Sequence, residues 1–186
     1  MREIAGTARI TAVKGEKHMR EITIKEALPD DAGKLIGYMK LIGGESDNLT
    51  FGSDGLPVTI EQEREFINNI HEDKRSALIL AWKGDQLIGD GSLTVLPRRM
   101  NHRAELGIAV RKSEWGNGVG SMIMRELIAH AKNHNIEIIS LEVKSDNLRA
   151  VRLYEKFGFR RIGTFPAYFK TDGQYSDFEL MYLDLR

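Results

Sequence analysis

The 186-residue sequence contains no cysteine. It therefore has no disulfide, no thiolate nucleophile and no zinc–thiolate site. It also lacks an uninterrupted apolar run long enough to cross a bilayer, and its N-terminus lacks the pattern of a secretory signal peptide. These absences predict a cytoplasmic protein that does not act at a membrane.

An excess of either charge is also missing, because 27 basic residues balance 27 acidic ones. Domains that bind nucleic acid usually carry a basic excess, so we expect no nucleic-acid partner. The length suits one domain with a sizeable core. We assign that domain to residues 19–186, preceded by an N-terminal extension of unknown role over residues 1–18.

Hydrophobic periodicity predicts a mixed order of strands and helices. The expected strands cover residues 20–25, 76–82, 86–95, 102–110, 138–143, 159–169 and 175–185. The expected helices cover residues 29–41, 59–71, 119–131 and 147–157, and a loop rich in small polar residues covers 43–57. Hairpin signals such as Asp172-Gly173 join neighbouring strands directly, which favours antiparallel pairing. The predicted fold class is α/β (α+β), with a mixed, mostly antiparallel sheet of about seven strands flanked by about four helices.

The most informative motif is Trp115-Gly116-Asn117-Gly118-Val119-Gly120, which lies between the strand ending at Val110 and a helix. Its glycines leave backbone N–H groups unshielded at a helix N-terminus, where unpaired donors and the dipole favour an anion. The motif therefore predicts a phosphate cradle.

Two common phosphate loops do not match this motif. A P-loop requires Lys-Ser or Lys-Thr after the glycines, and neither follows. A dinucleotide-binding loop requires its third glycine where Ser121 stands, directly after a strand, whereas the polar residues 111–114 intervene. Glu142 lies at the distance of a ribose-binding acid but is interpreted as a mid-strand residue. A nucleotide-dependent oxidoreductase is thus the weaker alternative.

A second motif follows in Asn147-Leu148-Arg149-Ala150 with Tyr154, and it ends in Phe157-Gly158-Phe159. Together with the glycine loop it resembles the GNAT superfamily of acyl-CoA-dependent N-acetyltransferases, over roughly residues 19–186. In that family a Gln/Arg-x-x-Gly-x-Gly/Ala loop holds the coenzyme A pyrophosphate, and an Asn-x-x-Ala-x-x-x-Tyr helix lines the thioester end. Trp115 stands at the family's Gln or Arg position, which removes a side-chain contact and leaves the backbone cradle.

The resemblance implies acetyl-CoA as cosubstrate and a strand whose backbone pairs with the pantetheine arm, with Gly107 marking a bulge. The implied cofactor-binding residues are Ile108, Ala109, Val110, Trp115, Gly116, Asn117, Gly118, Val119, Gly120, Ser121, Asn147 and Ala150. Basic residues close to the loop are interpreted chiefly as solvated surface charges. They are Arg111, Lys112, Arg149 and Arg152. No metal is expected, because His130 and His134 lack a third ligand.

The implied reaction needs a base and an acid. An acceptor amine is mostly protonated at neutral pH and must lose a proton before it attacks, whereas the leaving thiolate gains one. Tyr154 is the expected acid, although it could be only a core aromatic residue. Glu105 is the expected base, directly or through water, although it could be only an exposed strand-end carboxylate.

The sequence therefore predicts an N-acetyltransferase that moves an acetyl group from acetyl-CoA to a primary amine by direct attack in a ternary complex. The acceptor could be a small amine, an amino acid or a protein N-terminus. A catalytically silent acyl-CoA-binding module remains an alternative. A homodimer through the terminal strands follows from the resemblance alone.

Overall fold

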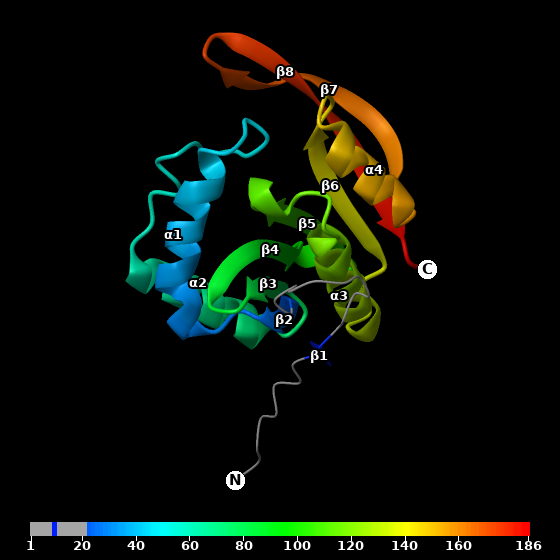
Figure 1. Cartoon of the computed structure of the whole chain (residues 1–186). Coiled ribbons are helices and arrows are strands. Elements are labelled where there is room, and N and C mark those ends of the chain that lie inside the picture. Colours follow the sequence, from blue (N-terminus) through cyan, green and yellow to red (C-terminus); the bar gives the residue numbers. More distant parts are fainter. Residues whose placement is uncertain (1–8, 11–21) are drawn as a thin grey trace.

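One β-sheet runs through the computed structural model, which describes residues 9–10 and 22–186 (Figure 1). Its strands are β1 (Arg9–Ile10), β2 (Ile22–Glu26), β3 (Ala77–Lys83), β4 (Gln86–Val95), β5 (Arg103–Val110), β6 (Ile138–Lys144), β7 (Arg160–Thr171) and β8 (Gln174–Asp184). The α-helices are α1 (Ala32–Gly43), α2 (Ile60–Asp73), α3 (Val119–Asn133) and α4 (Leu148–Lys156). Apart from β1, the extension predicted over residues 1–18 lies outside the described residues.

The strand order is β1-β2-β3-β4-β5-β6-β8-β7. Among the described strands every neighbouring pair is antiparallel except β5 and β6. The seven long strands and the four α-helices of the described chain confirm the predicted fold class. Within the described residues no helix is both long and apolar enough to span a bilayer.

Helices cover both faces of the sheet and bury a core on each. α1 and α2 pack on one face around Leu35, Ile67 and Leu80. α3 and α4 pack on the other, where Ile123 and Leu127 are fully buried. The amphipathic spacing of apolar residues in α3 thus directs one helix face into the core, as predicted.

Local signals at the start of α2 behave as expected. The Thr59 hydroxyl accepts from the Gln62 backbone N–H, and the Gln62 side chain accepts from the Thr59 N–H, so the pattern of Thr59 and Gln62 forms a capping box. The spacing of apolar residues in this helix predicts Phe66, Ile67 and Ile70 on its inner face. Ile67 and Ile70 are buried, whereas Phe66 is 45% exposed.

The feature that shapes the site is the short pairing of β5 with β6. These strands pair over only three positions, with Arg103–Glu105 opposite Ile138–Ser140. Beyond them β5 stays paired with β4 up to Val110. The two strands therefore diverge and leave one edge of β5 open.

The predicted bulge at Gly107 is wrong, because the β4–β5 register runs without interruption past this residue. Gly107 instead lies opposite Ser92, whose hydroxyl would be 3.2 Å from an added Cβ atom. The opening in the sheet comes from the divergence of β6 on the other side of β5, not from a distortion of β5.

Candidate active site

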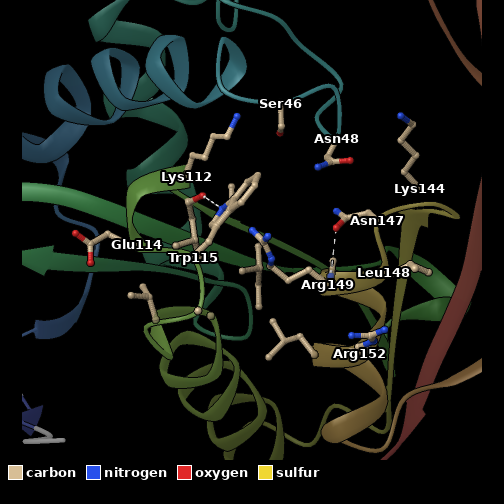
Figure 2. A pocket seen from close by; sticks show the side chains of 18 of the residues that line it. Ser46, Asn48, Lys112, Glu114, Trp115, Lys144, Asn147, Leu148, Arg149 and Arg152 are labelled. Carbon is tan, nitrogen blue, oxygen red and sulfur yellow. Dashed lines mark hydrogen bonds between the residues drawn. The ribbon is translucent and has the colours of Figure 1, made fainter. Parts of the chain in front are cut away.

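A groove of about 1030 Å³ runs along the open edge of β5 (Figure 2). Its walls are β5, the glycine loop, α4 and the loop that joins α1 to α2. Most of the predicted site residues line it: Ile108, Ala109, Val110, Trp115, Gly116, Gly118, Val119, Gly120, Ser121, Asn147, Ala150 and Tyr154. Two predicted residues, Glu105 and Asn117, do not.

The glycine loop begins α3 with two residues in the left-handed region. Gly116 has φ 84° and Gly118, the N-cap of α3, has φ 82°, conformations that other residues adopt at a cost. The Asn117 amide, which does not line the groove, donates to the Glu114 carboxylate at 3.3 Å. Glu114 also accepts from Lys83 Nζ at 2.9 Å. These contacts hold the loop at the groove, which Gly116, Gly118 and Gly120 line.

The direction of the β5 backbone groups follows from its pairing with β4. The Arg111 N–H donates to the Ile88 carbonyl at 3.0 Å, and in an antiparallel ladder alternate residues face the same neighbour. Ala109 therefore directs its backbone groups to β4, whereas Ile108 and Val110 direct theirs to the groove. The Val110 carbonyl already accepts from the Trp115 indole N–H at 2.7 Å. The edge that remains suits the pairing of an extended, amide-containing ligand.

The buried residues Asp90 and Tyr38 support the β5 wall of the groove. Asp90 lies opposite Ala109 in the ladder, and the Tyr38 hydroxyl donates to the Ala109 carbonyl at 2.9 Å. Burial raises the pKa of Asp90 to about 7, although the Tyr38 hydroxyl beside it acts in the opposite direction. One oxygen of Asp90 has no hydrogen-bond partner among the described residues. Asp90 thus holds its proton more tightly than an exposed carboxyl would.

Tyr154 lies on α4 at the groove, with a side chain that is only 6% exposed. Burial raises the pKa of Tyr154 to about 12, so the phenol keeps its proton at neutral pH. Asn147 precedes it as the N-cap of α4, where the side-chain oxygen accepts from the Ala150 N–H at 3.3 Å. Asn147 lines the groove, as the α4 motif predicts. The hydrogen bond by which it caps α4 was not predicted (Figure 2).

Two carboxylates lie at the point where β5 and β6 diverge. Glu105 is exposed on the last rung, opposite Ser140. Glu142 is two residues further along β6 and accepts from the Tyr168 hydroxyl at 2.7 Å. Because side chains alternate along a strand, Ser140 and Glu142 share one face of β6. The hydrogen bond to Glu142 is the main cause that raises the pKa of Tyr168, and the charge of Glu105 adds to it.

Tyr168 reaches β6 because β7 is irregular. The β7–β8 register shifts between Phe165 and Phe169, and Ala167 within this segment has φ 53°. The Tyr168 ring then stacks on Phe178 of β8, with centroids 4.6 Å apart. The shift therefore brings a β7 side chain across β8 to Glu142.

This arrangement was compared with known proteins. Residues 45–159 match the acetyltransferase (GNAT) family. The chain belongs to the GNAT family. An acetyltransferase structure from Streptococcus pneumoniae, also of this family, superposes with a TM-score of 0.86 at 29% identity, over 89% of this chain and 100% of that one. The yncA structure from Salmonella typhimurium, determined with its cofactor acetyl-CoA, has a TM-score of 0.78 at 17% identity, over 89% and 94% of the two chains.

Curated relatives of this GNAT chain match over shorter stretches. The L-amino acid N-acetyltransferase AaaT of Escherichia coli is 38% identical over 103 residues, or 54% of this chain and 62% of that protein. The N-alpha-acetyltransferase RimI of Mycobacterium tuberculosis is 32% identical over 94 residues, or 50% and 58%. The chain thus matches about 60% of the length of these relatives.

Family membership confirms the resemblance to the GNAT superfamily drawn from the glycine loop and the α4 motif. A dinucleotide oxidoreductase of the doubly wound type needs a largely parallel sheet, and the described sheet has one parallel pair. The oxidoreductase alternative is therefore excluded.

Sequence reasoning missed the contact between Tyr168 and Glu142. These residues are 26 positions apart, and they meet only because the register of β7 shifts. Pro166 in the middle of β7 is the sequence signal that could have indicated the irregularity, since proline interrupts a ladder.

Proposed function

We propose that this GNAT protein transfers the acetyl group of acetyl-CoA to a primary amine by direct attack in a ternary complex. The observation that carries the proposal is the open edge of β5, which leads from the glycine loop at one end to the carboxylates of the divergent strands at the other. Acetyl-CoA, when bound, supplies an acetyl thioester. The backbone groups of Ile108 and Val110 and the donors of the glycine loop hold it in the groove.

Tyr154 and Glu105 take the acid and base roles in this proposal. Glu105 accepts a proton from the acceptor ammonium, directly or through water, and the freed nitrogen attacks the thioester carbonyl. When the carbon–sulfur bond breaks, Tyr154 supplies the proton that the sulfur takes up. The amide nitrogen then loses its remaining extra proton, which returns through water to the Tyr154 phenolate, while Glu105 releases its own proton to solvent. Burial raises the pKa of Tyr154 to about 12, so the phenol is protonated before each turnover, as it would also be at its ordinary pKa of about 10.

A thermal unfolding scan with acetyl-CoA, NADH and ATP in separate samples tests the cofactor. At a hundred times its dissociation constant a ligand adds about 2.7 kcal/mol to the free energy of unfolding, which raises the midpoint by roughly 5–10 °C in a chain of this length. We expect a rise with acetyl-CoA alone. Thiol release in an amine panel then tests turnover. Binding without turnover of any amine would favour the silent acyl-CoA-binding module instead.

The choice of base is tested by comparing Glu105→Gln with Glu142→Gln. Loss of a general base typically lowers turnover by about 10²–10⁴-fold, so Glu105→Gln is expected to lower kcat by at least a hundredfold near neutral pH. The measurement is kcat as a function of pH for both variants. If Glu142→Gln shows the large loss and Glu105→Gln does not, the base is Glu142, whose carboxylate is held by Tyr168.

The acceptor is a primary amine of the kind that relatives use, namely an amino acid, a protein N-terminus or a small amine. The names of the Escherichia coli and Mycobacterium tuberculosis relatives support the first two kinds. We expect the enzyme to work in the cytoplasm. The exposed edge strand β7, with Ile162 64% exposed, supports a homodimer through the terminal strands.

A further inference from the structure

Two side chains meet across the groove from opposite walls. Trp115 belongs to the loop before α3, and Arg149 belongs to the first turn of α4. The Arg149 guanidinium carbon lies 4.0 Å from the centroid of the Trp115 ring (Figure 2). Both residues line the groove, so the pair lies within the proposed cofactor site.

Trp115 is held in place by its own contacts. Its indole N–H donates to the Val110 carbonyl at 2.7 Å, and Lys112 Nζ lies 6.0 Å from the ring centroid on the same wall. An aromatic ring that is held by a hydrogen bond at its polar atom presents a rigid face. A guanidinium can stack on this face with little further loss of conformational entropy by the ring. Trp115 thus fixes the position of an otherwise exposed arginine.

Arg149 has no acidic partner within the described part of the chain. Among the other cations in or near the groove, Lys83 pairs with Glu114, Arg111 with Glu45 and Lys144 with Asp146. Lys112, Arg152 and Lys156 also line the groove without an ion pair among the described residues, but of all these cations Arg149 lies nearest the Trp115 ring. A guanidinium that contacts a ring through its flat face keeps the N–H donors of its edge free. The paired N–H donors on the edge of a guanidinium match the spacing of the oxygens of a phosphate group.

We propose that Arg149, held on Trp115, is a phosphate-binding residue for coenzyme A; this rests on the proposed function. It replaces the interpretation of Arg149 as a solvated surface charge. The proposal also accounts for the aromatic residue at the family's Gln or Arg position. The Trp115 ring holds the guanidinium of Arg149, which comes from the facing helix α4, beside the glycine loop. The ligand group is a phosphate of the cofactor, either the diphosphate or the ribose 3′-phosphate.

Calorimetric titration of coenzyme A and dephospho-coenzyme A tests the assignment. Arg149→Gln is expected to raise the Kd of coenzyme A about tenfold, the effect of one charge-assisted hydrogen bond. Arg149→Lys should recover part of the affinity, because it keeps the charge without the planar fork. The matched control is Arg161→Gln, which removes the same charge from a surface pair with Glu155.

The two ligands identify the phosphate. If Arg149→Gln weakens coenzyme A but not dephospho-coenzyme A, the partner is the 3′-phosphate; equal weakening assigns the diphosphate. An unchanged Kd for coenzyme A in Arg149→Gln, with folding confirmed by circular dichroism, overturns the proposal. Wild-type protein that binds coenzyme A without acetylating any amine refutes the catalytic function and leaves this site intact. Wild-type protein that fails to bind coenzyme A refutes both.

Tryptophan fluorescence gives a second readout that keeps Arg149 in place. The chain has two tryptophans, and Trp82 is buried in the core on the other face of the sheet. In a Trp82→Phe variant the emission therefore reports Trp115 alone. Coenzyme A is expected to shift or quench it in a saturable titration. Unchanged emission at a concentration that saturates the calorimetric signal would contradict the pairing.

Discussion

Replacing Tyr154 with phenylalanine is expected to lower kcat by about a hundredfold or more, because it removes the only atom through which this side chain can protonate the leaving sulfur. The ring that fills the wall of the groove remains. The Kd of acetyl-CoA should therefore change by less than about threefold, well below the effect of a lost charge-assisted hydrogen bond. Steady-state kinetics together with calorimetric titration separates the two quantities.

The matched control for this substitution is Tyr175→Phe, which removes a hydroxyl from a side chain that is 64% exposed on the terminal hairpin. Its kcat should equal that of the wild type. Equal kcat values for Tyr154→Phe and the wild type would remove Tyr154 from the acid role. Burial keeps the pKa of Tyr154 near 12, so deprotonation of this phenol should not limit the wild-type kcat below about pH 11.

Replacing Asp90 with asparagine is expected to stabilise the protein at pH 8 by about 2–4 kcal/mol. Burial raises the pKa of Asp90 to about 7, whereas in the unfolded chain it is about 3.9. Between these values the native state binds a proton that the unfolded state has lost, so wild-type stability falls as pH rises from about 4 to 7. Asparagine removes this dependence. Urea unfolding at pH 4, 5, 6, 7 and 8 measures it.

Asp85→Asn, an exposed turn substitution, controls for the loss of one negative charge. It should shift the free energy of unfolding by less than about 0.5 kcal/mol at every pH. If wild type and Asp90→Asn lose stability in parallel between pH 4 and 7, another group causes the dependence. The substitution also lies beneath Ala109 in the groove wall, so unchanged acetyl-CoA affinity would show that the wall keeps its shape without the acid.

The fold could be predicted largely from the sequence because its signals are local. The turn Lys83-Gly84-Asp85 marked the start of a strand over 86–95, which matches β4 at Gln86–Val95, and the Thr59–Gln62 capping box marked the start of α2. The divergence of β5 and β6 could be expected only from the family resemblance. The guess of a bulge at Gly107 failed because a glycine in a strand can equally mark a close contact, here with Ser92.

The cofactor side of the site was more predictable than the acceptor side. The glycine loop and the α4 motif are contiguous segments, and nearly all their predicted residues line one groove. The acceptor side is built from strands that are distant in the chain, so its contacts depend on register. Tyr168 and Glu142 are the example, since a shift in β7 decides whether they meet. The pairing of Trp115 with Arg149 likewise depends on how two elements pack.

Because β5 and β6 pair over so short a stretch, a ligand bound between them would complete the sheet. With three paired positions, the sheet is narrow at its middle, and the sections on either side also share one hydrophobic core with α3. In the proposed binding mode, an extended ligand in the groove takes the place of a missing strand between β5 and β6 and bridges both sections. Affinity and rigidity would then depend on the same hydrogen bonds, and product release would break the bonds that join the two sections.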